Sequence, residues 1–345
     1  MNEFGLPRRL LHWFASFLAA AILVLICSGG LVTSHEAGMA VPDWPNSFGY
    51  NMFLFPVSRW IGGVFFEHTH RLIASGVGML TLVLCGLAFA VEDRRWVKTL
   101  AGVAVLAVIV QGVLGGLRVT EHNAVLGLFH GCLAQSFFAL VAVIALVTSR
   151  FWRAFARHAA EPGLLIFRRW TLVVTAMVFI QLVLGAAMRH SHSGLAVHDF
   201  PTVYGGVLPP VTATAIDTIN QTRAAQAELP TSVGLILLHY VHRVWAVALV
   251  IGIVSIGSAA MRQANFPRIL KRFALIWMLL VAVQFALGAW TIWSNKAADI
   301  ATSHVLFGAL TLMNGVLFSV TLCKFVACAN VAGSDPSTRM EAARA

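Results

Sequence analysis

Charged residues are scarce in this chain of 345 residues: Asp, Glu, Lys and Arg together make up 11% of it, and 59% is hydrophobic. A soluble domain carries about 25% charged residues, so the composition excludes an ordinary soluble protein. Apolar runs of about 20 residues, the length that crosses a bilayer, occur eight times. They lie at about 11–33, 63–90, 97–117, 124–148, 168–188, 233–259, 273–293 and 301–323. The sequence therefore predicts an all-α integral membrane protein with eight transmembrane helices.

Cysteine is also scarce, and the loops on one side of the predicted membrane have none. The five cysteines fall within predicted helices or near the end of the last one: Cys27, Cys85, Cys132, Cys323 and Cys328. Because structural disulfides favour oxidising compartments, where external loops lie, we predict no structural disulfide.

Acidic residues are outnumbered, 14 against 24 Lys and Arg, which gives a net charge of +10. Of the 24 basic residues, 17 lie in the termini and in the loops on one side, five lie on the opposite side and two lie within helices. The positive-inside rule predicts that both termini are cytoplasmic, in a bacterial inner membrane. The apolar run after Arg8 and Arg9 is predicted to be a retained helix rather than a signal peptide. The charge indicates topology and contact with anionic lipid rather than nucleic-acid binding.

The two halves of the chain repeat each other. Segments 38–49 and 194–205, both in external loops, share six of their twelve residues at a constant offset of 156. The repeat predicts two tandem four-helix bundles related by a pseudo-two-fold axis along the membrane normal. The predicted units are an N-terminal bundle, a C-terminal bundle and a flexible cytoplasmic tail: 1–150, 151–328 and 329–345.

Four histidines recur at equivalent places in the repeat, two in each half: His70, His130, His242 and His304. A lone histidine within a membrane helix most often serves helix packing or proton transfer. Two imidazoles on facing helices are the usual way to hold a heme iron between axial ligands. The two-fold pattern therefore favours two heme sites, one in each bundle, with these histidines as iron ligands.

The second predicted helix places Glu67, His70 and Arg71 on one face, at positions i, i+3 and i+4. Ionisable groups are costly within a membrane and usually face a cofactor, an ion or each other. Glu67 is matched by His239 in the second half, so only the first half has a carboxylate beside its histidine pair. Such a carboxylate can position substrate, move protons or stabilise positive charge, or it can form an ion pair with Arg71.

Arg71 and Arg243 follow their histidines directly and are predicted to bind heme propionates or, alternatively, helix carbonyl groups. His68 points about 100° away from Glu67 and is the weakest candidate in its run. The other histidines near external loops are read mainly as solvated loop residues: His35, His122, His190, His192 and His198. His198 is the exception to consider, because it adjoins the repeated Asp-aromatic-Pro turn.

These motifs together resemble the heme A synthase family of cytochrome oxidase assembly proteins, and the resemblance covers nearly the whole chain. It rests on Glu-x-x-His-Arg at 67–71, on the three other histidines and on the repeated external segments at 38–45 and 194–201. The resemblance implies oxidation of the C8 methyl group of heme O to a formyl group, through successive hydroxylations with water as the oxygen source. It implies that His70 and His130 flank this substrate, that Glu67 is catalytic, and that His242 and His304 hold a heme b cofactor.

The resemblance also implies partners: heme O synthase, other oxidase assembly factors and an electron acceptor that the sequence does not identify. A homo-oligomer is compatible with the sequence. Some members of the family carry a cysteine pair in an external loop, and this chain has none there. A thiol-based step is therefore not carried over.

Two other functions remain open from the residues. A diheme b-type electron-transfer protein fits the composition and the paired histidines, but a symmetrical relay gives no reason for a carboxylate in one half only. A transporter fits the parallel repeat, but its helices would be interrupted near the membrane midplane. The polar residues of this chain cluster near the outer ends of the helices instead.

Overall fold

The computed structural model describes residues 5–153 and 163–333. Eight helices in this part of the chain are long and apolar enough to cross a membrane, and no β-strand is found there. This confirms the predicted all-α membrane fold. The eight helices are α1 Leu6–Ser34, α2 Gly63–Val91, α3 Arg95–Thr120, α4 Ala124–Thr148, α6 Leu164–His190, α8 Val233–Arg262, α9 Arg268–Trp293 and α10 Ala298–Gly333.

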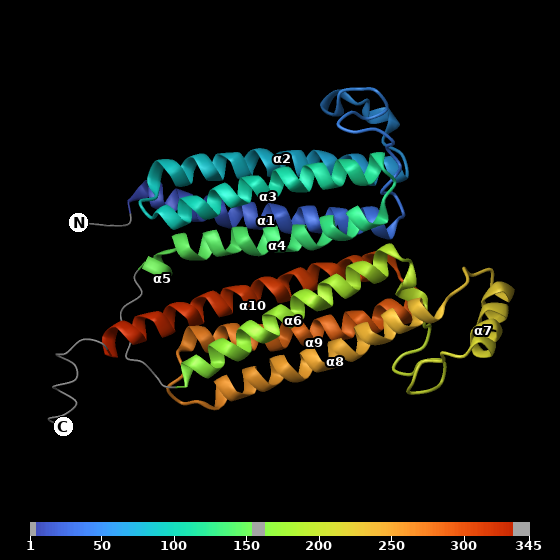
Figure 1. The fold of residues 1–345 in the computed structure, drawn as a ribbon. Coiled ribbons are helices and arrows are strands. Elements are labelled where there is room, and N and C mark those ends of the chain that lie inside the picture. Colours follow the sequence, from blue (N-terminus) through green and yellow to red (C-terminus); the bar gives the residue numbers. More distant parts are fainter. Residues whose placement is uncertain (1–4, 154–162, 334–345) are drawn as a thin grey trace.

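The helices lie in two groups of four (Figure 1). In the first group, α1 contacts α2 and α4, and α3 contacts the same two helices. In the second group, α10 contacts α6 and α9, and α8 contacts the same two helices. The groups meet where α10 packs on α1 and α4, and where α4 packs on α6. Because α4 and α10 lie at this junction, they have the largest buried share of the eight helices.

The start of α1 and the end of α10 lie at one end of the molecule, here called the terminal pole, and the long loops lie at the other end, the loop pole (Figure 1). The second long loop contains a helix that the sequence reading did not identify, α7 Ala213–Ala225, which begins at the N-capping side chain of Thr212. At the terminal pole, α4 is followed by the short helix α5 Arg150–Arg153. The last helix, α10, continues past the predicted boundary at residue 328, and residues 334–345 lie outside the described part.

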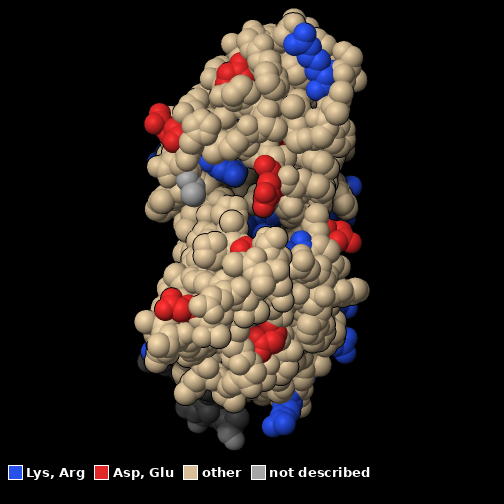
Figure 2. Space-filling view, turned by 90° about the vertical axis from the view of Figure 1, so that its right-hand side faces the viewer, with Lys and Arg blue, Asp and Glu red and all other residues tan. Residues whose placement is uncertain are grey.

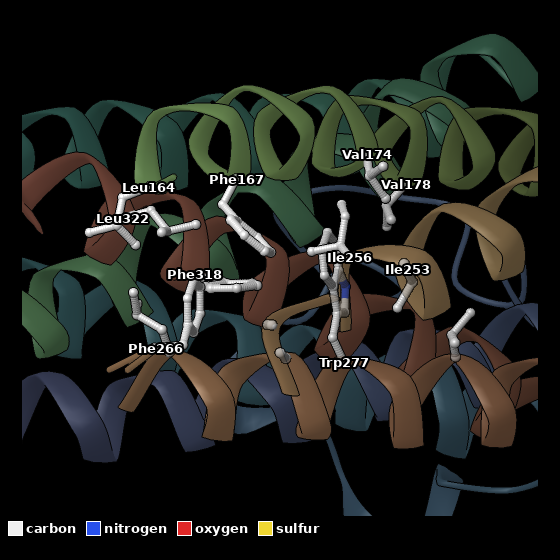
Figure 3. Close-up of a cluster of buried hydrophobic side chains, with 14 of the residues drawn as sticks. Leu164, Phe167, Val174, Val178, Ile253, Ile256, Phe266, Trp277, Phe318 and Leu322 are labelled. Atoms are coloured by element: carbon white, nitrogen blue, oxygen red, sulfur yellow. The ribbon is translucent and has the colours of Figure 1, made fainter. Parts of the chain in front are cut away.

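The hydrophobic core of the second group fills the half of the helices nearer the terminal pole (Figure 3). Trp277 is fully buried there and donates its indole N–H to the carbonyl oxygen of Thr311 at 3.0 Å. On α6 the buried residues of this cluster end at Val178, seven residues before Gly185. Large apolar side chains therefore seal one half of the group, whereas small residues face the interior in the half near the loop pole.

The two repeated loop segments fold in the same way. The carboxylate of Asp43 accepts hydrogen bonds from the backbone N–H groups of Phe48 and Gly49, at 2.7 and 2.8 Å. The carboxylate of Asp199 accepts the equivalent pair from Tyr204 and Gly205, at 2.8 and 2.9 Å. Burial alone would raise the pKa of both carboxyl groups, but these backbone donors outweigh it and lower the pKa values. Each aspartate therefore fixes a tight turn above its helix group.

At the terminal pole, the buried carboxylate of Glu92 joins the turn after α2 to the end of α4. Glu92 Oε2 accepts from Arg94 at 2.8 Å and from Arg153 of α5 at 2.5 Å. Arg94 also donates to the carbonyl oxygen of Val147 at 2.9 Å. Burial alone would raise the pKa of Glu92, but the hydrogen bonds and charge of Arg94 and the charge of Arg153 lower it from 4.5 to about 2.

Replacing Glu92 with glutamine is expected to lower the free energy of unfolding at neutral pH by about 2 kcal/mol, because two partly buried guanidiniums lose their counter-charge. A carboxyl group with a depressed folded-state pKa stabilises the fold above its unfolded pKa, here 4.5, and loses this effect as the pH falls towards 2. The deficit of Glu92→Gln should therefore shrink between pH 4.5 and pH 2, as measured by thermal unfolding in detergent.

The neighbouring Asp93 provides the matched control for this prediction. Its ion pair with Arg8 is mostly exposed to solvent, with 76% of the Asp93 side chain accessible. Exposed pairs contribute little to stability, so Asp93→Asn should change unfolding only slightly. An equal deficit of Glu92→Gln at neutral and acidic pH would contradict the ionic origin of the effect.

Candidate functional site

Each of the four repeated histidines lies against a glycine of the neighbouring helix. A Cβ atom placed on Gly29 of α1 would lie 3.0 Å from Cε1 of His70 on α2, and one on Gly115 of α3 would lie 3.1 Å from Cε1 of His130 on α4. The second group repeats these contacts at 3.3 Å between Gly185 and His242 and at 3.2 Å between Gly288 and His304. Any larger residue would push the imidazole, so the glycines make room for the rings.

The histidines of each group lie close to one another. His130 is close enough to His70, and His304 close enough to His242, for a charge on one ring to act on the other. All four side chains are half-buried and lie in the half of the molecule near the loop pole. The structure thus brings together one imidazole pair in each helix group.

The ring nitrogens of the first pair differ in their surroundings from those of the second. His70 Nδ1 lies 3.2 Å from the hydroxyl oxygen of Ser28, and His130 Nδ1 lies 3.2 Å from the carbonyl oxygen of Gln111. A hydrogen bond from Nδ1 fixes the tautomer that presents Nε2 to a metal. In the second group, Nδ1 of His242 and of His304 is buried and has no hydrogen-bond partner within the described part of the chain.

These features fit a heme better than a bare metal ion. Among the described residues, no three or more His, Cys, Asp or Glu side chains gather into a metal-binding cluster. A heme brings four nitrogen ligands of its own and needs only two from the protein, which is what each group offers. The glycines make room for the imidazole rings, and the surrounding helices are apolar.

Glu67 and Arg71 are joined to each other and to the first long loop. Glu67 is only 4% exposed; its Oε1 accepts from Arg71 at 2.7 Å and its Oε2 accepts from the backbone N–H of Val41 at 2.9 Å. Arg71 also donates to the carbonyl oxygens of Val41 and Asp43, at 2.9 and 2.6 Å. Both oxygen atoms of the carboxylate are therefore fixed by donors, at a position one helical turn before His70 on α2.

Arg243 makes the corresponding contacts in the second group. It donates to the carbonyl oxygens of Thr202 and Val197, at 2.9 and 3.3 Å, as Arg71 does to Asn46 and Val41. His239, at the position of Glu67, is 2% exposed, and its Nδ1 has no hydrogen-bond partner within the described residues. Both arginines thus bind carbonyl groups of the long loops, and not the helix carbonyl groups that the sequence offered as an alternative to heme propionates.

Two of the remaining histidines pack against other parts of the protein. His68 is fully buried, lies 3.1 Å from the Ser47 hydroxyl and packs against Phe55 and Trp60, so it serves the loop. His190 at the end of α6 is not a solvated loop residue, because a Cβ atom on Gly127 of α4 would lie 2.5 Å from its ring.

Sequence reasoning missed Arg118 and Arg189, which it counted only as external positive charges. Arg118 is within electrostatic reach of both His70 and His130. Arg189 is within reach of His304 and donates to the carbonyl oxygen of Gly30 at 2.6 Å. The signal that could have found them is their spacing, because each follows a histidine-facing glycine by one helical turn.

Comparison with known proteins agrees with this arrangement. The family model described as cytochrome oxidase assembly protein matches residues 57–316, which is most of the chain. The chain belongs to the heme A synthase family of cytochrome oxidase assembly proteins.

Members of the heme A synthase family match this chain nearly end to end. Heme A synthase of Halalkalibacterium halodurans is 26% identical over 326 residues, which cover 92% of this chain and 96% of that protein. Heme A synthase of Alkalihalophilus pseudofirmus is 24% identical over 314 residues, which cover 88% and 96%. The matched region includes all four histidines and Glu67.

Proposed function

We propose that this chain is a heme A synthase, an oxidoreductase that converts the C8 methyl group of heme O to a formyl group by successive hydroxylations. The observation that carries the proposal is the histidine-on-glycine contact, repeated four times and arranged as one imidazole pair in each helix group. It occurs in a chain whose relatives are named heme A synthase.

In this proposal, the substrate heme O binds between His70 and His130, and heme b binds between His242 and His304. When bound, heme b supplies one-electron redox chemistry. Glu67 comes one helical turn before His70 on α2, and the equivalent position of the second group is His239. This difference favours the first group as the place where the methyl group reacts. Arg71 and Arg243 flank the two sites and fix the loops that cover them.

Glu67 has the role of a catalytic carboxylate in this proposal. Each hydroxylation takes its oxygen atom from water and releases a pair of electrons and a pair of protons. A carboxylate near the methyl carbon stabilises positive charge that develops there and accepts protons. Arg71 and the N–H of Val41 hold both oxygen atoms of Glu67, which fixes the position of the carboxyl group.

The setting of the reaction follows from the topology. The eight membrane-spanning helices and the basic terminal pole support a bacterial inner membrane protein with both termini in the cytoplasm. The four histidines then lie towards the outer face. Heme O synthase would supply the substrate, oxidase assembly factors would receive the product, and a further electron acceptor would take the electrons. A homo-oligomer is compatible with this setting.

Pigment analysis tests the proposed function. The full-length protein, purified from a host that also makes heme O, is expected to yield heme A or its alcohol precursor together with heme b. Extracted pigments would be separated by chromatography and identified by mass spectrometry. The double variant His70→Ala/His130→Ala is the control, and it should yield neither heme A nor the alcohol. Heme b alone from the wild type, despite available heme O, would overturn the proposal.

A further inference from the structure

Arg118 and Arg189 place two positive charges near each other where the two helix groups meet at the loop pole. Arg118 extends from the end of α3, and a Cβ atom on Gly127 of α4 would lie 3.0 Å from its Nε. Arg189 extends from the end of α6 across to the carbonyl oxygen of Gly30 in α1, at 2.6 Å. The two guanidiniums are within electrostatic reach of each other. Figure 2, which looks onto the loop pole, shows basic side chains near the middle of this face.

Arg118 has no counter-charge of its own. Its guanidinium makes no hydrogen bond or ion pair with any residue in the described ranges 5–153 and 163–333. The carboxylate within its electrostatic reach is Glu67, but both oxygen atoms of Glu67 already accept from Arg71 and the N–H of Val41. Two like charges close together, one of them unpaired and partly buried, are unfavourable unless an anion lies between them.

Each arginine follows a histidine-facing glycine in its own helix group. Arg118 comes three residues after Gly115, which faces His130, and Arg189 comes four residues after Gly185, which faces His242. The Cα atom of each arginine therefore lies about one helical turn, roughly 5 Å, nearer the loop pole than the Cα atom of its glycine. In the repeat, the positions equivalent to Arg118 and Arg189 are Thr291 and Thr33. Each helix group thus has one arginine at this level, and both point to the junction.

We propose that Arg118 and Arg189 form a carboxylate-binding pair for the propionates of the two hemes. Arg118 binds a propionate of the heme between His70 and His130, and Arg189 binds a propionate of the heme between His242 and His304. This inference rests on the proposed function.

The chemistry of the groups suits this assignment. A guanidinium binds a carboxylate with two parallel hydrogen bonds, which fixes its orientation as well as its position. Both amino groups of Arg71 and of Arg243 already donate to loop carbonyl groups. Arg189 donates through Nη2 to Gly30 and Ser34 of α1, which leaves Nη1 and Nε without a hydrogen bond to a described residue, and Arg118 makes no hydrogen bond within the described part of the chain. On this assignment, the two arginines would hold heme carboxylates at the loop-pole end of each site.

Heme binding with and without free carboxylates tests the proposal. Full-length protein purified without heme would be titrated with iron protoporphyrin IX and with its dimethyl ester. The protein would carry His304→Ala, so that the titration measures binding at the first site. Arg118→Leu is expected to weaken binding of the free acid by about tenfold, because a charge-assisted bidentate contact is lost. The ester should bind the arginine and leucine forms equally. Arg118→Lys should restore part of the affinity.

The reciprocal experiment measures binding at the second site, in the His70→Ala background. There, Arg189→Leu should weaken binding of the free acid and leave binding of the ester unchanged. Arg59→Leu is the matched control, because Arg59 is an exposed loop arginine that lies over the ring of Tyr50, and it should change neither titration. Equal affinity for acid and ester in the parent proteins, or no effect of Arg118→Leu, would overturn the propionate assignment and leave the proposed function standing. Failure of the unmutated protein to bind any heme would overturn both.

Discussion

His242→Ala protein is expected to lose the heme b of the second helix group, with its content falling at least about tenfold. His242 supplies one of the two imidazoles that this group offers, and Gly185, which faces it, has no side chain to replace it. Heme b per protein, measured by the pyridine hemochrome spectrum after purification, is the readout. The proposed substrate site between His70 and His130 is on other helices, so its two histidines stay in place in this variant while the heme b signal should disappear.

His198→Ala is the control for loss of a histidine as such. His198 lies in the second long loop, where its Nε2 is 3.1 Å from a carboxylate oxygen of Glu228, and it belongs to neither imidazole pair. Its replacement should leave the heme b content unchanged. Wild-type heme b content in His242→Ala would rule out His242 as an axial ligand.

The fold and the histidine pairs were predictable because their signals are local in the sequence. Runs of apolar residues set the eight helices, and the repeated His-Arg dipeptides at 70–71 and 242–243 mark equivalent helix positions. The small residues near the outer helix ends were visible too. Their contact with the imidazoles follows once neighbouring helices pack side by side, because only glycine admits a ring at this distance.

The contacts between distant segments were not predictable in the same way. Arg118 and Arg189 approach each other because α4 of the first group packs against α6 of the second. That packing depends on the shapes of both helix groups, and no spacing within one helix encodes it. The hydrogen bond from the N–H of Val41 to Glu67 likewise depends on how the first long loop folds back over α2.

Glu67→Gln is expected to slow the conversion of heme O by about 100-fold or more while heme binding persists, so that heme O or the alcohol intermediate accumulates. The substitution keeps the size of the side chain and an oxygen that can accept from Arg71, but it removes the negative charge and the proton acceptor. Pigments extracted from the purified variant, compared with those of the wild type from the same host, give the ratio of heme O and alcohol to heme A. A normal yield of heme A would exclude Glu67 from the chemistry.

The structure adds a competing explanation, because Glu67 also anchors the first long loop through the N–H of Val41. Asp43→Asn separates the two roles. The Asp43 carboxylate holds the turn of the same loop through the N–H groups of Phe48 and Gly49 and does not touch Glu67. If Glu67 acts on the methyl group, Asp43→Asn should loosen the loop and still make heme A. If both variants accumulate the same intermediate to the same extent, Glu67 acts by placing the loop over the site, and the carboxylate is a positioning residue.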